Sequence, residues 1–163
     1  MIQSSVVRLA TPVDRKECWR LLMQAHTENG IFELSSTRVN WWLDIILEPN
    51  NTRGAIAVIG AVGRLEALCF IVFGQYWYSD QRHLEEFIVY VDPECRKSNH
   101  AKALVNWMKE QSEATGLPLV TGIMSNTRTE AKVRLYERML PKVGAFFLWN
   151  PKGSGSYAVA SSS

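Results

Sequence analysis

The sequence has few of the features that mark secreted, membrane-spanning or metal-binding proteins. Its three cysteines are an odd number, and no basic and apolar leader opens the chain, so we expect a reducing, cytoplasmic compartment. Glu66 interrupts the longest apolar stretch, Leu65 to Phe73, which is far shorter than the ~20 residues of a spanning helix, so we expect no membrane span. The cysteines and the three histidines lack the spacing of zinc ligands, and no metal is expected.

The composition is that of an ordinary folded domain. The chain has 163 residues, of which 47% are hydrophobic and 21% charged. Six Trp, six Phe and five Tyr supply ample apolar area for a core, and no repeat or linker divides the chain. We therefore expect one domain over residues 1–160, with residues 161–163 frayed.

Charge is unevenly distributed along the chain, although the net charge is only +2. Residues 1–95 carry 8 Lys/Arg and 12 Asp/Glu, whereas residues 96–163 carry 10 and 4. A basic half favours an anionic ligand and an acidic half favours a cationic one, with chance distribution as the alternative. A specific nucleic-acid partner is not expected, because no recognised motif occurs and the net charge is near neutral.

Hydrophobic periodicity predicts the order β-α-α-β-β-β-α-β-α-β-β. Strands are expected at 5–11, 55–62, 67–78, 84–91, 119–124, 145–149 and 156–160. Helices are expected at about 14–29, 36–48, 99–115 and 127–140, with Gly116 as a stop signal. The prediction is an α/β fold: a mixed, mostly antiparallel sheet of about seven strands, with about four helices on both faces.

A candidate anion site lies where the strand ending at Val91 leads through a basic turn into a helix. Arg96, Lys97 and Lys102 surround the expected helix start, and no acid occurs between Arg96 and Lys109. A helix N-terminus presents unpaired N–H groups and a positive dipole end, which suits phosphates. The alternative is a solvated basic helix start.

This segment resembles the acyl-CoA-binding motif of the GNAT superfamily of acyl-CoA N-acyltransferases. The motif is a strand ending in Val-x-Pro-x-x, then Arg/Gln-x-x-Gly-x-Gly/Ala, then a helix; here it stands as Val91-Asp92-Pro93-Glu94-Cys95, then Arg96-Lys97-Ser98-Asn99-His100-Ala101. The order of the elements resembles this family too. The resemblance implies an N-acetyltransferase that uses acetyl-CoA. Asn99 replaces the first loop glycine; Asn tolerates a left-handed backbone, but its side chain is expected to crowd the pyrophosphate.

The resemblance also implies how acetyl-CoA would be held. Backbone amides from Lys97 to Ala101 would bind the pyrophosphate, and His100 would act there through its backbone rather than its ring. The strand carrying Val89 to Val91 would splay from Leu119–Met124, pair with the pantetheine arm and polarise the thioester carbonyl through an N–H. The residues expected to bind the cofactor are Val89, Tyr90, Val91, Arg96, Lys97, Ser98, Asn99, His100, Ala101 and Asn126.

Tyr136 is the first candidate catalytic residue. Leu135-Tyr136-Glu137-Arg138 resembles the family's Leu-Tyr-Glu-Lys segment, whose tyrosine often protonates the leaving thiolate. Thr129 and Lys132 stand where the family often has Asn and Ala. The alternative for Tyr136 is a core aromatic on an amphipathic helix.

Glu85 and Glu86 are candidates for the general base that deprotonates the attacking amine. Adjacent residues on a strand point to opposite faces, so one of the two carboxylates is expected to reach the cleft. In several family members an acid on this strand has that role. Either residue could serve, and the alternative is a solvated acid pair.

The acceptor is expected to be a small-molecule or peptide amine. Glu28, Phe32, Tyr76 and Tyr78 are expected to bind it, because an acidic and aromatic lining suits a protonated amine; the aromatic residues could equally belong to the core. The rival function is a non-catalytic binding module on the same fold, acting through protein contacts. A homodimer is also open, with Phe146–Trp149 as its contact.

Overall fold

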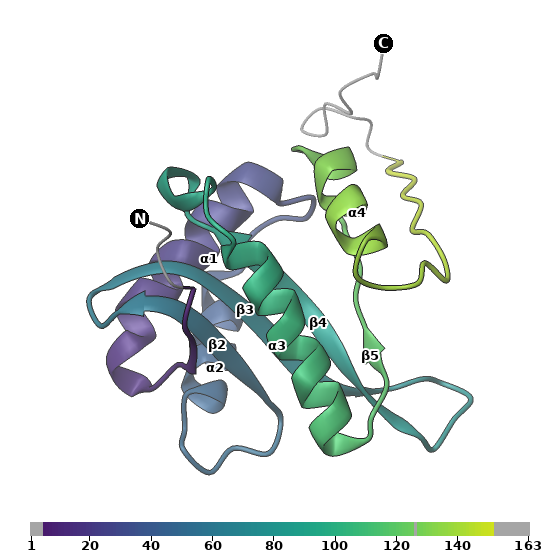
Figure 1. Cartoon of the computed structure of the whole chain (residues 1–163), viewed down its shortest axis with the longest axis horizontal. Coiled ribbons are helices and arrows are strands. Elements are labelled where there is room, and N and C mark those ends of the chain that lie inside the picture. The colour runs from purple at the N-terminus through teal and green to yellow at the C-terminus, as the bar shows by residue number, and fades with distance from the viewer. Residues whose placement is uncertain (1–4, 126, 152–163) are drawn as a thin grey trace.

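The protein is a β-sheet covered by helices on both faces (Figure 1). The computed structural model describes residues 5–125 and 127–151. The strands are β1 (Val7–Leu9), β2 (Gly54–Ala61), β3 (Arg64–Gln75), β4 (Arg82–Val91) and β5 (Leu119–Val120). The helices are α1 (Arg15–Asn29), α2 (Ser36–Ile46), α3 (His100–Thr115) and α4 (Thr129–Glu137), with short 3₁₀ turns η1 (Pro12–Asp14) and η2 (Pro93–Cys95). The predicted α/β class is confirmed.

The strands lie in the order β1-β2-β3-β4-β5. Neighbours are antiparallel except β4 and β5, which are parallel because α3 crosses from one to the other. We expected about seven strands, and the described residues form five. The segment Ala145–Trp149 forms no strand, since no described backbone pairs with it. The strand predicted at Ser156–Ala160 lies outside the described residues, as do residues 161–163.

Two strand boundaries differ from the prediction in ways that shape the site. β3 begins at Arg64, directly after a turn in which Gly63 has φ 83°, and ends at Gln75, so Tyr76 and Tyr78 fall beyond the strand. β5 stops at Val120 instead of reaching Met124. Alternation of residue types shows which residues suit a strand, but a strand ends where its neighbour stops offering backbone partners.

The helices bury the two faces of the sheet in two separate clusters. α1 and α2 cover one face and α3 crosses the other, as Figure 1 shows. The first cluster contains, among others, Leu21, Leu43, Ile56, Leu68 and Phe70. The second contains Ala57, Cys69, Leu104, Val105 and Met108. Alternate residues of β2 and β3 point to opposite faces, which explains how one strand serves both clusters. Gly116 ends α3 in the left-handed conformation (φ 70°), as its glycine predicted.

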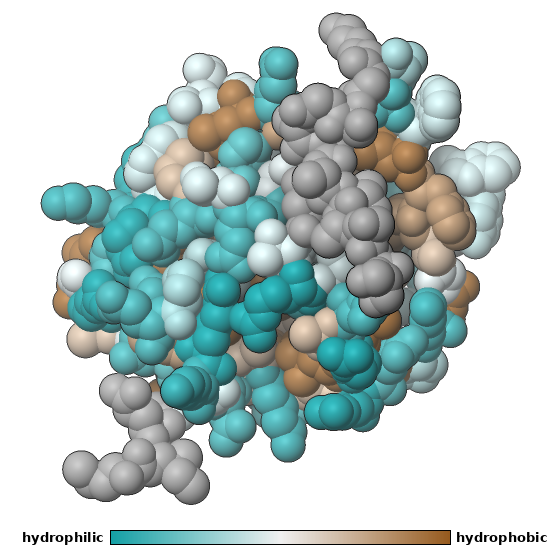
Figure 2. Space-filling model, turned by 90° about the horizontal axis from the view of Figure 1, so that it is seen from above, coloured by the Kyte–Doolittle hydropathy of each residue, from teal (hydrophilic) through white to brown (hydrophobic). Residues whose placement is uncertain are grey.

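The surface is mixed in character. Figure 2, seen from the top of Figure 1, shows mostly hydrophilic side chains on this face, with hydrophobic ones in separate patches. Within residues 5–125 and 127–151, no helix combines the length and apolar character needed to cross a bilayer. The same residues hold no cluster of three or more His, Cys, Asp or Glu side chains arranged for a metal ion.

Arg20 of α1 fixes the end of β4 to the rest of the sheet. Its guanidinium donates to Asp92 Oδ2 and to the Leu65 carbonyl, each at 2.7 Å, and to Glu17 Oε2 at 2.7 Å. Asp92 in turn accepts from the Glu94 N–H at 3.0 Å and so caps the turn that leads toward α3. Burial alone would raise the pKa of Asp92, but the hydrogen bonds from Arg20 and the Glu94 N–H and the charges of Arg20 and Arg64 together hold the pKa below its usual range.

We expect Arg20→Met to lower the free energy of unfolding by about 3 kcal/mol, because it leaves two largely buried carboxylates without a counter-charge. Arg64→Met is the matched control: its ion pair with Glu94 is exposed on both sides, so its loss should cost less than about 1 kcal/mol. Urea denaturation of both variants measures the difference. Equal losses would show that the Arg20 network does not hold this turn.

Candidate functional site

A cleft of about 800 Å³ opens where β4 and β5 diverge. The two strands pair only at Leu84–Leu119 and Glu85–Val120. Beyond that point Val89 to Val91 form one wall, and residues 121–125 and α4 form the other. The loop between α1 and α2 also lines the cleft. Its volume is that of a site for a small molecule or cofactor arm.

A β-bulge in β4 determines which side chains face the cleft. Phe70 of β3 pairs with Ile88 and Ile71 pairs with Glu86, so Phe87 is an extra residue with no partner opposite it. Glu86 lies on the sheet face covered by α3 and α4, and its neighbour Glu85 lies on the opposite face. Both line the cleft, which places the two acids predicted from the sequence on either side of β4.

Glu86 and Tyr136 are brought together at the base of the cleft. The Tyr136 hydroxyl lies 2.8 Å from each oxygen of the Glu86 carboxylate and donates to it. Burial raises the pKa of Glu86 to about 7, although hydrogen bonds from Tyr136 and the Val89 N–H pull it down. Burial and the neighbouring carboxylate raise the pKa of Tyr136 well above its ordinary value. Glu86 can therefore gain or lose a proton near neutral pH while Tyr136 keeps its own, and α4 and β4 hold the pair in place.

The start of α3 closes one end of the cleft, where Arg96, Ser98 and Ala101 line it. No acid occurs in the first turn of α3, whose N–H groups lack intrahelical partners. Asn99 has φ −92°, so the loop does not use the left-handed backbone that we expected there. Lys97 and Asn99 are exposed and do not line the cleft.

His100 contributes its backbone to this turn while its ring points into the protein. The ring is fully buried; Nε2 donates to Glu66 Oε2 at 2.7 Å, and Nδ1 lies 2.7 Å from Ser5 Oγ. The ring thus anchors the start of α3 to β3 and to the segment before β1. Sequence reasoning gave this side chain no role, because both of its partners are distant in the chain.

Glu28 lies beside Arg96, at the α3 end of the cleft. Arg96 Nη2 and the Tyr90 hydroxyl both donate to Glu28 Oε2, at 2.5 and 3.1 Å. Burial alone would raise the pKa of Glu28, but the hydrogen bond and charge of Arg96, the Tyr90 hydroxyl and the charge of Lys132 together lower it. The other oxygen, Oε1, is buried without a hydrogen-bond partner among the described residues. Glu28 is thus a largely buried carboxylate whose charge is neutralised by Arg96 at this end of the cleft.

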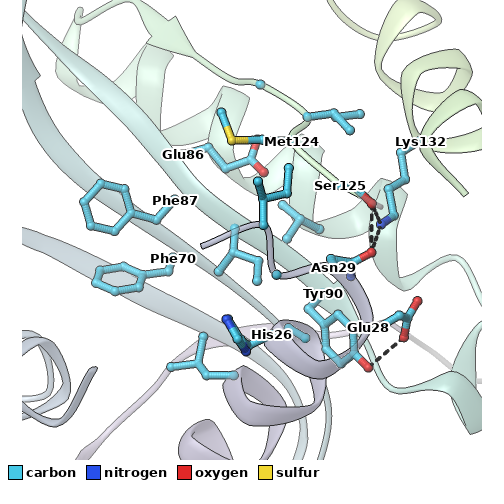
Figure 3. A pocket seen from close by; sticks show the side chains of 18 of the residues that line it. His26, Glu28, Asn29, Phe70, Glu86, Phe87, Tyr90, Met124, Ser125 and Lys132 are labelled. Atoms are coloured by element: carbon cyan, nitrogen blue, oxygen red, sulfur yellow. Dashed lines mark hydrogen bonds between the residues drawn. The ribbon is translucent and has the colours of Figure 1, made fainter. Parts of the chain in front are cut away.

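Lys132 was not predicted as a site residue, yet it faces the cleft (Figure 3). Its Nζ donates to Asn29 Oδ1 at 2.6 Å and to Ser125 Oγ at 2.8 Å, and Thr127 Oγ1 donates to the Glu28 carbonyl at 2.9 Å. Burial lowers the pKa of Lys132. These bonds tie the end of α1 to the start of α4 across the cleft. The available signal was spacing, because Lys132 lies one helical turn before Tyr136.

The expected acceptor-binding residues are not all in one place. Phe32 lines the cleft, in the loop after α1. Tyr76 and Tyr78 lie in the turn between β3 and β4, exposed and outside the lining residues; their rings contact each other, with centroids 5.1 Å apart. β3 ends before them, which is why they do not reach the cleft. Asn126 lies outside the described residues.

Comparison with known proteins gives a consistent result. Residues 16–140 match the model of the acetyltransferase (GNAT) family. No curated protein matches the chain. A possible acetyltransferase from Clostridium difficile 630 has 16% identity and a TM-score of 0.68, over 89% of this chain and 96% of that one. The ribosomal-protein-alanine N-acetyltransferase from Brucella melitensis biovar Abortus 2308 has 16% identity and a TM-score of 0.65, over 89% and 97%.

A further similar structure contains a ligand. AAC(6')-Iy, in complex with the bisubstrate analog CoA-S-monomethyl-acetylneamine, has 10% identity and a TM-score of 0.70, over 91% of this chain and 98% of that one. The TM-scores show that these proteins share a fold with this chain, and at identities this low they show the fold alone.

The raised pKa of Glu86 predicts a pH dependence of stability. Between 4.5 and about 7 the folded state keeps the proton that the unfolded state loses. The free energy of unfolding of the wild type should therefore fall by about 3 kcal/mol as pH rises through that window, and then level off. Glu86→Gln removes the titrating group, so the free energy of unfolding of this variant should fall less over the same pH range.

Urea denaturation at about pH 5 and about pH 8 tests this. Glu137→Gln is the control: Glu137 follows Tyr136 on α4 but is exposed, and it should follow the wild type. If the free energy of unfolding of Glu86→Gln changed between the two pH values by as much as that of the wild type, the raised pKa of Glu86 would be contradicted.

Proposed function

The chain belongs to the GNAT acetyltransferase family, and on that premise we propose that it transfers an acetyl group from acetyl-CoA to a primary amine, which attacks directly in a ternary complex. The observation that carries the proposal is the contact between Tyr136 and Glu86, at the base of a cleft whose other end is the start of α3. An acid–base pair and an anion-binding helix terminus thus share one cavity.

The residues at hand suit acyl-CoA. The start of α3 and Ser98 offer donors for phosphates, with Arg96 beside them. Beyond Glu85, β5 no longer pairs with β4, so the edge of β4 from Glu86 to Val91 is open to an extended arm. When bound, acetyl-CoA supplies an activated thioester. The residues that would hold it are Arg96, Ser98, Ala101 and the backbone of Val89 to Val91.

Glu86 and Tyr136 divide the proton transfers between them. As the amine forms the new C–N bond, the Glu86 carboxylate takes the proton from its nitrogen. As the C–S bond breaks, Tyr136 gives its hydroxyl proton to the leaving sulfur. Glu86 then returns a proton to Tyr136 across their 2.8 Å contact, so the pair ends as it began. A backbone N–H of the β4 edge, from Val89 to Val91, would support the developing negative charge on the carbonyl oxygen.

A non-catalytic binding module is the second candidate. The observation in its favour is that Arg96 is already paired with Glu28, so an incoming phosphate must compete for that guanidinium.

We also propose a cytoplasmic location and a homodimer. Cys18, Cys69 and Cys95 are all free thiols, which fits a reducing compartment. Phe146, Phe147 and Trp149 are exposed, which fits a contact with a second copy.

Calorimetric titration with acetyl-CoA separates the two candidate functions. A transferase should bind acetyl-CoA with a micromolar Kd, which corresponds to a binding free energy of about −8 kcal/mol. ATP should bind much more weakly, because it lacks the pantetheine arm. CoA without the acetyl group reports how much the thioester adds. Absence of binding would favour the non-catalytic module and direct the search to protein partners.

Substitution of the pair tests its chemistry. Tyr136→Phe should lower kcat about 100-fold and leave the Kd for acetyl-CoA unchanged. It should also move the midpoint of the kcat/KM pH profile upward from about 7, because Tyr136 lowers the pKa of Glu86. A wild-type kcat would remove Tyr136 from the mechanism.

Glu86→Gln and Glu85→Gln form a matched pair of neighbours on opposite faces of β4. Glu86→Gln should lower kcat about 100-fold and abolish the rise of the rate near pH 7. Glu85→Gln should keep kcat within about threefold, since Glu85 makes no contact with Tyr136 in the structure. The opposite pattern would make Glu85 the base.

A further inference from the structure

An aromatic surface lines the cleft beside Glu86. The bulge in β4 turns Phe87 toward α2, where its ring packs edge-on against Trp42 and Phe70, with centroids 5.2 and 5.0 Å away. All three rings line the cleft. Phe87 remains 45% exposed even so, which leaves part of its ring open to an occupant. Figure 3 shows Phe70 and Phe87 side by side, with Glu86 nearby.

The rest of this part of the cleft is also apolar. Leu22 of α1 and Val39 of α2 line the cleft and pack against the same cluster as Trp42 and Phe70, and Met23, Met124 and Phe146 are further apolar residues of the lining. A group bound against Phe87 would therefore be enclosed by aliphatic and aromatic side chains. Because Phe87 follows Glu86 directly, an amine attached to that group would lie near the proposed base.

Charge in the cleft argues against a polycation. Four acids line it, but Glu28 is paired with Arg96 and Glu86 with Tyr136. The remaining acids, Glu33 and Glu85, share the lining with the cations Arg38, Arg128 and Lys132. One ammonium group can approach the Glu86 carboxylate, whereas a second or third would be desolvated against apolar walls in a lining whose acids are balanced by cations.

Building on the proposed function, we propose that the acceptor is a small primary amine with a single positive charge and an aromatic group on a short linker. The aromatic group packs on Phe87, Trp42 and Phe70, where edge-to-face contacts with a further ring are favourable. The linker reaches past the bulge and presents the nitrogen to Glu86.

Acetyl transfer to a panel of amines tests the proposal. We expect kcat/KM for 2-phenylethylamine to be about tenfold or more above the values for 1,4-diaminobutane and for an aminoglycoside. Burying an apolar group of the substrate in an apolar pocket changes kcat/KM by about this factor. n-Propylamine, which has the same single charge but no ring, measures the contribution of the ring. Equal or better transfer to the polycations would overturn the inference and leave the proposed function standing.

Substitutions at Phe87 test where the aromatic group of the acceptor binds. Phe87→Ala should raise the KM for 2-phenylethylamine about tenfold and leave the KM for acetyl-CoA unchanged. Phe147→Ala is the matched control: this ring is 95% exposed and does not line the cleft, so both KM values should stay as in the wild type. Phe87→Leu keeps most of the apolar volume, so it still tests the role of the ring if the alanine variant fails to fold. It should retain the fold and show an intermediate KM.

A binding measurement decides the matter even if no transfer is found. Saturation-transfer NMR on the protein alone should show the ring protons of 2-phenylethylamine in contact, and the signal should disappear in Phe87→Ala but persist in Phe147→Ala. Contact without transfer would count against the proposed function only. No contact would overturn the aromatic acceptor.

Discussion

Two residues of parallel pairing are all that join β4 to β5, and the cleft exists because the pairing stops there. β4 has β3 as a partner along its length, so its position does not depend on β5. Among the described residues, no strand pairs with its other edge from Glu86 onward, where the side chains and backbone of the site lie. An unpaired strand edge is normally a liability. In this protein α4 and the segment after β5 stand opposite that edge and enclose a cavity with it.

Buried polar contacts hold the walls of the cleft at their distance. Arg20 ties the end of β4 to α1, His100 ties the start of α3 to β3, and Lys132 ties α4 to the end of α1. Each joins elements far apart in the chain, and each would leave a buried polar group unsatisfied if broken. The two largely apolar core clusters hold the helices against the sheet, and these polar contacts determine where the ends of the helices lie. The same reasoning explains Glu86: α4 supplies the tyrosine that makes a carboxylate tolerable in its partly buried place.

The elements were predicted best where a local signal exists. Gly116 ends α3 and helices cover both faces of the sheet, as expected. Predictions were wrong where the outcome depends on a partner strand: Ala145–Trp149 is not a strand, and β3 ends before Tyr76. The bulge at Phe87 has no sequence signature, since neither glycine nor proline marks it. Asn99 was expected to need a special conformation, but its φ of −92° is open to any residue.

The sequence by itself determined the class of the fold, the basic helix start after Val91, and the short set of side chains able to do acid–base chemistry, because spacing and residue type are local properties. Only the tertiary structure decided which of them meet. Glu85 and Glu86 are equivalent in sequence, and the register of β4 against β3 and the position of α4 place Glu86 against Tyr136. Lys132 and Glu28 acquired their neighbours in the same way. A hydrogen bond between residues 50 or more positions apart depends on how strands and helices pack, which no local pattern encodes.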